Sequence, residues 1–165
     1  MYLCVNNLTL IAFRHMKIKN EGQEMVPFET AQWLHSIGFA ERTRYRYAVQ
    51  SFELCATGRH IVKKCDVGDS VKYGDCVDTM DFLNHAISAP DAFTASEYIR
   101  KKSGLECLVK SDDLQKHFCQ LVAYKSIVIM ESGVHGDPDE ALQEMFDKRQ
   151  FRKCVENEIE KRKIK

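Results

Sequence analysis

The chain has 165 residues, 44% of them hydrophobic and 29% charged, which are the proportions of an ordinary folded protein rather than of a disordered one. Its 24 basic and 24 acidic side chains balance, so the chain as a whole has no strong attraction for nucleic acid, membranes or acidic substrates. No apolar run approaches the roughly 20 residues that cross a bilayer, so we expect no membrane insertion.

The cysteines indicate a compartment. There are seven of them, an odd number without a regular spacing, and the first apolar run is too short for a secretory signal. Such thiols are typical of a reducing environment, and we expect a cytoplasmic protein that folds as one domain.

The first half of the chain is predicted to hold an N-terminal strand and linker over residues 1–26, followed by a helical core over 27–132. Within that core a short helix follows Pro27 and ends at Gly38. Apolar side chains at helical spacing then predict a second helix over residues 41–56. A hairpin is expected over 59–74, because β-branched residues flank the turn-forming residues 66–69.

Further helices are predicted along the rest of the core. One begins at Asp75 and ends before Pro90, and another has capping-box spacing at Thr94 and Glu97 and ends at Gly104. Ser111 is expected to open a third, whose buried residues would be Leu114, Phe118, Leu121 and Val122. The following run SIVIMES either ends that helix or forms a buried strand.

The last segment, residues 137–165, is predicted to be a C-terminal helix with Asp137 as its N-cap and Pro138 in the first turn. Its apolar stripe changes face near Arg149. The helix therefore either breaks there or packs on two surfaces, one of which would belong to a second subunit in a homodimer. The predicted fold class is mainly α, that is α+β with a minor β-hairpin.

Charge is distributed unevenly along the sequence. Between residues 42 and 64 there are six basic side chains and one acidic one, Glu53, and between residues 66 and 91 there are six aspartates and one lysine. These two blocks either form a basic and an acidic patch for different partners or neutralise each other in the folded protein.

The stretch CATGRHIVKKCDVGDSVKYGDC, residues 55–76, contains the residues best suited to metal binding or thiol chemistry. The possible ligands are Cys55, His60, Cys65 and Cys76. Their spacing lacks the close CxxC pair that grips a tetrahedral zinc, so buried structural thiols are the expected reading and no metal or other cofactor is predicted. A catalytic Cys65 assisted by His60 is a further alternative.

Residues 30–49, with the sequence TAQWLHSIGFAERTRYRYAV, resemble the helix-turn-helix motif of phage and bacterial regulators. In this resemblance Gly38 takes the turn and ERTRYRY opens the recognition helix. The residues facing the DNA groove would be Arg42, Thr43, Tyr45, Arg46 and Gln50. The hairpin would be the wing of a winged helix-turn-helix, with its backbone contacts made by Arg59, Lys63 and Lys64.

The sequence thus predicts a non-enzymatic regulatory protein that binds double-stranded DNA through residues 42–64. Two alternatives stay open. One is a protein-binding inhibitor or adaptor that uses the acidic block 66–91 and the C-terminal helix. The other is a cysteine- or metal-dependent enzyme.

Overall fold

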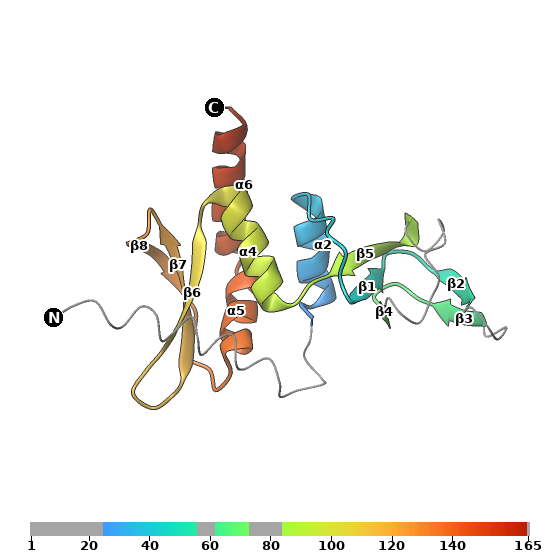
Figure 1. Ribbon diagram of the computed structural model, residues 1–165, viewed down its shortest axis with the longest axis horizontal. Coiled ribbons are helices and arrows are strands. Elements are labelled where there is room, and N and C mark those ends of the chain that lie inside the picture. The colour runs from blue at the N-terminus through green and yellow to red at the C-terminus, as the bar shows by residue number, and fades with distance from the viewer. Residues whose placement is uncertain (1–24, 56–61, 73–83, 165) are drawn as a thin grey trace.

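The computed structural model describes residues 25–55, 62–72 and 84–164 (Figure 1). In chain order its elements are α2 (Phe28–Ser36), β1 (Tyr45–Ala48), β2 (Phe52–Cys55), β3 (Val62–Cys65), β4 (Ser70–Lys72), β5 (Ala86–Ala89), α4 (Ala92–Ser103), β6 (Glu106–Ser111), β7 (His117–Ala123), β8 (Ile127–Glu131), α5 (Pro138–Asp147) and α6 (Arg149–Lys163). No helix in these ranges is long and apolar enough to cross a membrane.

The predicted mainly α fold is wrong, because the protein has an α+β fold with antiparallel sheets in both halves of the described chain. One sheet has the strand order β4-β1-β5, strands β2 and β3 form a two-stranded ribbon, and the third sheet has the order β6-β7-β8. Every pair of neighbouring strands is antiparallel.

The helices cover one face of the β6-β7-β8 sheet. Helices α4 and α5 pack on β6 and β7, and α6 packs on both of these helices. Helix α2 packs on β5, and the sheet β4-β1-β5 with the ribbon β2-β3 extends away from the helices on the other side of α2 (Figure 1).

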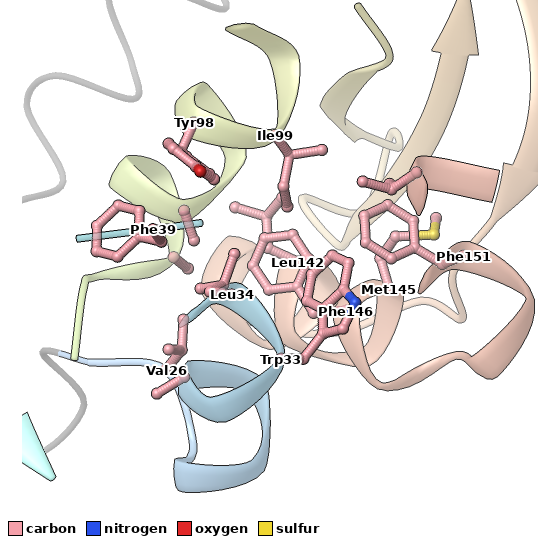
Figure 2. Close-up of a cluster of buried hydrophobic side chains, with 14 of the residues drawn as sticks. Val26, Trp33, Leu34, Phe39, Tyr98, Ile99, Leu142, Met145, Phe146 and Phe151 are labelled. Carbon is pink, nitrogen blue, oxygen red and sulfur yellow. The ribbon is translucent and has the colours of Figure 1, made fainter. Parts of the chain in front are cut away.

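The main core lies where α2, α4, α5 and α6 meet (Figure 2). The rings of Trp33 and Phe151 pack edge to face with centroids 5.8 Å apart, and the centroid of the Phe146 ring lies 5.7 Å from that of Phe151. The Trp33 indole also donates a hydrogen bond of 2.9 Å to Glu156 on α6. Residues from both ends of the described chain therefore share one core, which joins α2 to the C-terminal helices.

Several local predictions are confirmed. Helix α2 ends before Gly38, which has a φ of +97°. Gly104 ends α4 in the left-handed conformation, with a φ of +74°. The cap of α4 differs from the prediction, since the carboxylate of Asp91 accepts the Thr94 amide at 2.7 Å, whereas Glu97 pairs with Arg100.

The helix expected from Ser111 is wrong, because residues 106–123 form the hairpin β6-β7. Asp112 stabilises the turn of this hairpin instead of capping a helix, because its carboxylate accepts the amides of Leu114 and Lys116, both at 2.9 Å. Aspartate side chains satisfy backbone amides equally well in turns and at helix N-termini. The ambiguous run SIVIMES contains strand β8.

The C-terminal segment is two helices, so its prediction as one helix is corrected and the predicted break near Arg149 is confirmed. Asp137 caps α5, accepting the Asp139 amide at 2.7 Å, and Lys148 is extended between α5 and α6 with a ψ of 119°. The bend brings Met145 of α5 and Phe151 of α6 into the same core. The change of apolar face thus has an explanation within one chain and no longer supports a homodimer.

Candidate nucleic-acid interface

Strands β1 to β4 form one long antiparallel hairpin, which we call the long hairpin. Tyr45 lies opposite Lys72 at its base and Cys55 lies opposite Val62 toward its tip, so both arms span the same number of residues and keep a single register. The predicted hairpin over 59–74 is therefore corrected: β3 and β4 are strands, but they belong to the same arm, and they pair with β2 and β1.

The turn-like residues 66–69 form a kink within that returning arm rather than the end of a hairpin. The Asp69 amide donates to the Asp66 carbonyl at 3.0 Å, and the Asp66 amide donates to the Asp69 carboxylate at 2.8 Å. Gly68 has a φ of +88°, which glycine adopts most easily, and its amide still pairs with Ala48 of the opposite arm at 2.9 Å. The kink thus leaves the register of the long hairpin intact.

The base of the long hairpin is anchored in the protein. Tyr47 is buried, its hydroxyl donates to the Val26 carbonyl at 2.9 Å, and its ring packs edge to face on Phe28. The opposite face carries a second apolar cluster, made of Ala48, Leu54, Cys65, Val71 and Ala86 with Phe52 beside it. Alternating side chains therefore bury residues on both faces of the sheet.

Basic side chains from three separate stretches of the sequence lie along this hairpin and the segment leading into it. Arg42, Arg44, Lys63, Lys64 and Lys72 are exposed, and Arg46 is half-buried. In the described ranges 41–55 and 62–72 these six cations stand against four carboxylates, those of Glu41, Glu53, Asp66 and Asp69. The net charge of the described part of the hairpin is therefore +2.

The helix predicted over residues 41–56 is wrong, since β1 and β2 occupy this stretch. The tyrosines and arginines from 44 to 47 alternate, so their spacing also fits a strand. Pairing decides between the two, because β1 lies opposite β5, with Tyr47 facing Ile87, and buries its tyrosines there. The recognition helix implied by the helix-turn-helix resemblance does not form at these residues.

Three of the predicted groove-facing residues have structural roles instead. The Thr43 hydroxyl donates to the Tyr45 carbonyl at 2.6 Å and accepts the Ala89 amide at 3.1 Å. Tyr45 is half-buried against the main core, and the Gln50 amide contacts the His85 imidazole. Arg42, Arg46, Lys63 and Lys64 keep side chains at or near the surface, and Arg59 lies outside the described residues.

The possible metal ligands are not brought together in the described part of the chain. His60 and Cys76 lie outside it, and Cys55 belongs to β2. Cys65 is buried, and burial raises the pKa of its thiol, which disfavours the thiolate that nucleophilic catalysis needs. Residues 25–55, 62–72 and 84–164 hold no group of three His, Cys, Asp or Glu side chains that could bind a metal ion.

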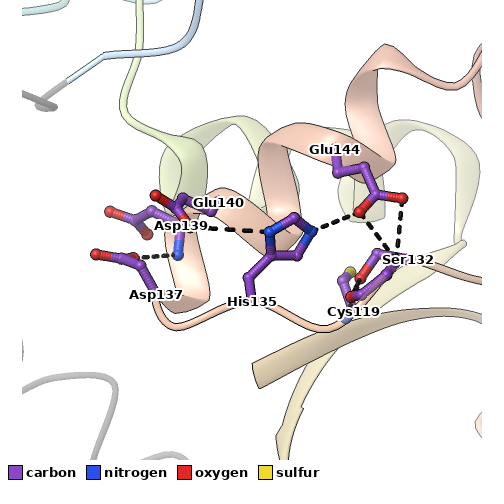
Figure 3. A network of polar contacts seen from close by, with 8 residues as sticks. Cys119, Ser132, His135, Asp137, Asp139, Glu140 and Glu144 are labelled. Atoms are coloured by element: carbon purple, nitrogen blue, oxygen red, sulfur yellow. Dashed lines mark hydrogen bonds and ion pairs between the residues drawn. The ribbon is translucent and has the colours of Figure 1, made fainter. Parts of the chain in front are cut away.

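A polar cluster that sequence reasoning missed lies between α5 and the loop after β8 (Figure 3). The Glu144 carboxylate accepts the Gly133 amide at 2.9 Å and lies 2.5 Å from His135 Nε2 and 2.9 Å from Lys148 Nζ. These donors lower the pKa of Glu144 to about 2. The cluster fastens a loop to a helix, and only the fold brings its members together.

Strands β6 and β7 bring together a pair of thiols that are far apart in the sequence. Cys107 and Cys119 lie on the same face of the sheet, toward the main core. A hydrogen bond that the Cys107 thiol donates to Cys119, together with burial, raises the pKa of Cys107 well above its ordinary value. The Cys107 thiol therefore stays protonated, and it packs with the buried Cys119 as a small apolar side chain.

Comparisons with known proteins give no family for this chain. No family model matches it, and neither a curated protein nor a solved structure is significantly similar to it. Its function has to be argued from its own residues.

Proposed function

We propose that the protein binds double-stranded DNA through the long hairpin, as a non-enzymatic regulatory protein of the cytoplasm. The observation that carries the proposal is that the long hairpin, which extends away from the helices, has the cations of residues 42–46 and 72 at its base and those of residues 63–64 toward its tip. A ribbon of this kind fits the major groove, and cations supply most of the affinity of DNA-binding proteins through contacts with phosphates.

The contacts we expect are with the phosphate backbone rather than with base edges. Thr43 and Gln50, which could have read bases, contact other residues of the protein, whereas the exposed Lys63 and Lys64 are neighbours on β3 and point to opposite faces of the ribbon. Phosphates line both sides of a groove, so cations on either face can reach them. Binding should therefore depend steeply on salt and weakly on base sequence.

The test is a fluorescence-anisotropy titration of duplex DNA at about 50 and 200 mM salt. The variant Lys63→Ala/Lys64→Ala should weaken binding and lower the slope of log K against log salt by about 2, which is about one for each lost phosphate contact. The control Lys110→Ala/Lys116→Ala removes the same charge from exposed positions on the β6-β7 hairpin. Equal effects of the two variants, or no binding at low salt, would contradict the proposal.

A protein-binding module is the second candidate function, and the exposed apolar residues of β8 favour it. Ile127, Val128 and Ile129 are consecutive on this strand and all exposed. Three of the six aspartates in the acidic block 66–91 lie outside the described residues, and the apolar face of α6 is buried on its own chain. Size-exclusion chromatography with light scattering of wild type and Ile127→Lys tests it, because an apolar interface would dissociate in the variant.

A further inference from the structure

The turn between β7 and β8 contains two residues in a conformation that their side chains disfavour. Tyr124 has a φ of +51° and Lys125 a φ of +68°, and the Ser126 amide closes the turn on the Ala123 carbonyl at 3.3 Å. Both central positions of such a turn require the left-handed region, where Asn and Gly are the preferred residues. A tyrosine and a lysine here are unfavourable for the turn itself, which points to a use for their side chains.

The Tyr124 side chain contributes little to the stability of the fold. It is 83% exposed and belongs to neither hydrophobic cluster, whereas Tyr45, Tyr47 and Tyr98 all pack against the main core or inside it. An aromatic ring at the end of a hairpin with this exposure is a planar apolar surface offered to solvent.

Cations lie at the same end of the molecule as this ring. Lys125 follows it in the turn, and Lys161 of α6 lies close enough to interact electrostatically with Tyr124. The C-terminal ends of α4 and α6 lie at this same end of the molecule (Figure 1), and the Arg162 guanidinium lies over Gly104. We call Tyr124, Lys125, Lys161 and the cations of these two helix ends the β7-β8 tip.

Part of the charge at the β7-β8 tip is already paired. Arg100, Lys161 and Lys163 form ion pairs with glutamates on their own helices. Among the described residues no ion pair involves Lys101, Lys102, Lys125 or Arg162. Cations in the last turn of a helix offset its dipole, which explains the basic residues at the ends of α4 and α6. It does not explain Lys125 or the exposed ring of Tyr124, which lie in a turn.

We propose that the β7-β8 tip binds single-stranded nucleic acid, with Tyr124 stacking on a base and the neighbouring cations contacting phosphates. An exposed aromatic ring among cations is how proteins hold single strands. Bases of a duplex are stacked on one another, so this ring would find a free base face only in a single strand. The inference is separate from the proposed duplex contacts of the long hairpin, which lies beyond α2 (Figure 1).

The experiment is an anisotropy titration with labelled deoxythymidine and uridine strands of about 20 nucleotides, a length that exceeds the site of a small binding module. Tyr124→Ala should weaken binding roughly 5- to 150-fold, the range of one base-aromatic stack, while Tyr124→Phe keeps most of the affinity. Comparing the deoxythymidine and uridine strands shows whether the site prefers single-stranded DNA or single-stranded RNA. Leu114→Ala, at a 77% exposed apolar residue of the β6-β7 turn, is the matched control.

A further variant separates binding from folding. Tyr124→Asn places a preferred residue at the left-handed position, so the melting temperature should rise while single-strand affinity falls. The variant Lys63→Ala/Lys64→Ala should keep its single-strand affinity, which distinguishes this site from the long hairpin. The inference is overturned if wild type does not bind the strands at about 50 mM salt, or if Tyr124→Ala and Leu114→Ala behave alike.

Discussion

His135 Nε2 lies 2.5 Å from a carboxylate oxygen of Glu144, and the same carboxylate also accepts the Gly133 amide. His135 is joined to the β6-β7-β8 sheet as well, because its backbone exchanges two hydrogen bonds of 2.7 Å with His117 of β7. One glutamate on α5 thereby fixes the loop that leads from the sheet into the helix layer.

Replacing Glu144 by Gln should lower the free energy of unfolding by about 1 to 2 kcal/mol near neutral pH. The amide can still accept the Gly133 N–H, but the charge-assisted contacts with His135 and Lys148 are lost, and partial exposure reduces what each contributes. Urea denaturation measures the change. Glu140→Gln is the control, because Glu140 is 3.8 Å from His135 and 49% exposed, and it should change stability by less than about 0.5 kcal/mol.

Glu144 also predicts how stability depends on acid. Its pKa is lowered from 4.5 to about 2 in the folded protein, so folding favours the ionised carboxylate. The stabilisation is complete above the ordinary value of 4.5 and is lost as the pH falls from there through about 2. Unfolding free energies measured across this window should fall more steeply for wild type than for Glu144→Gln. Parallel pH profiles would contradict the role given to this carboxylate.

Local stereochemistry was predictable from the sequence where one residue decides it. Gly38 and Gly104 end helices because each adopts a positive φ, and Asp137 caps α5 because its carboxylate reaches a free amide. Asp112 shows the limit of this reasoning. Its carboxylate bonds amides in a turn with the chemistry that a helix cap uses, so the residues alone do not distinguish a helix from a hairpin.

Pairing between distant segments was not predictable. Tyr45 fits both a helical stripe with Ala48 and a strand that alternates with Tyr47 on the same face. Pairing with Ile87 and Ala89 of β5 selects the strand. The candidate interface also has one feature that the sequence predicts and one that depends on distant contacts. The local excess of cations between residues 42 and 64 could be counted in the sequence, but the internal bonds of Thr43 and Gln50 depend on β5 and His85.

Gly104→Ala should destabilise the protein by about 1 to 2 kcal/mol, because the residue has a φ of +74° and a Cβ there would meet the Arg162 guanidinium. The guanidinium is at the end of the flexible Arg162 side chain and can move, so most of the lost stability should come from the backbone conformation. Thermal unfolding measures the change. Gly136→Ala is a matched control, since its Cβ would meet nothing within 4 Å, and equal effects would contradict the prediction.

Thr43→Val distinguishes the observed role of this residue from the one implied by a helix-turn-helix. The Thr43 hydroxyl links the start of β1 to β5 by donating to Tyr45 and accepting from Ala89. Valine has a similar shape without the hydroxyl, so both partners lose a hydrogen bond at a half-buried site, and stability should fall by about 1 to 3 kcal/mol. Thr43→Ser keeps the hydroxyl and should recover most of that loss in the same denaturation experiment. The duplex affinity of the folded Thr43→Val variant should equal that of wild type. If Thr43 read bases, the variant would instead bind duplex DNA more weakly at unchanged stability, and that result would contradict this structure.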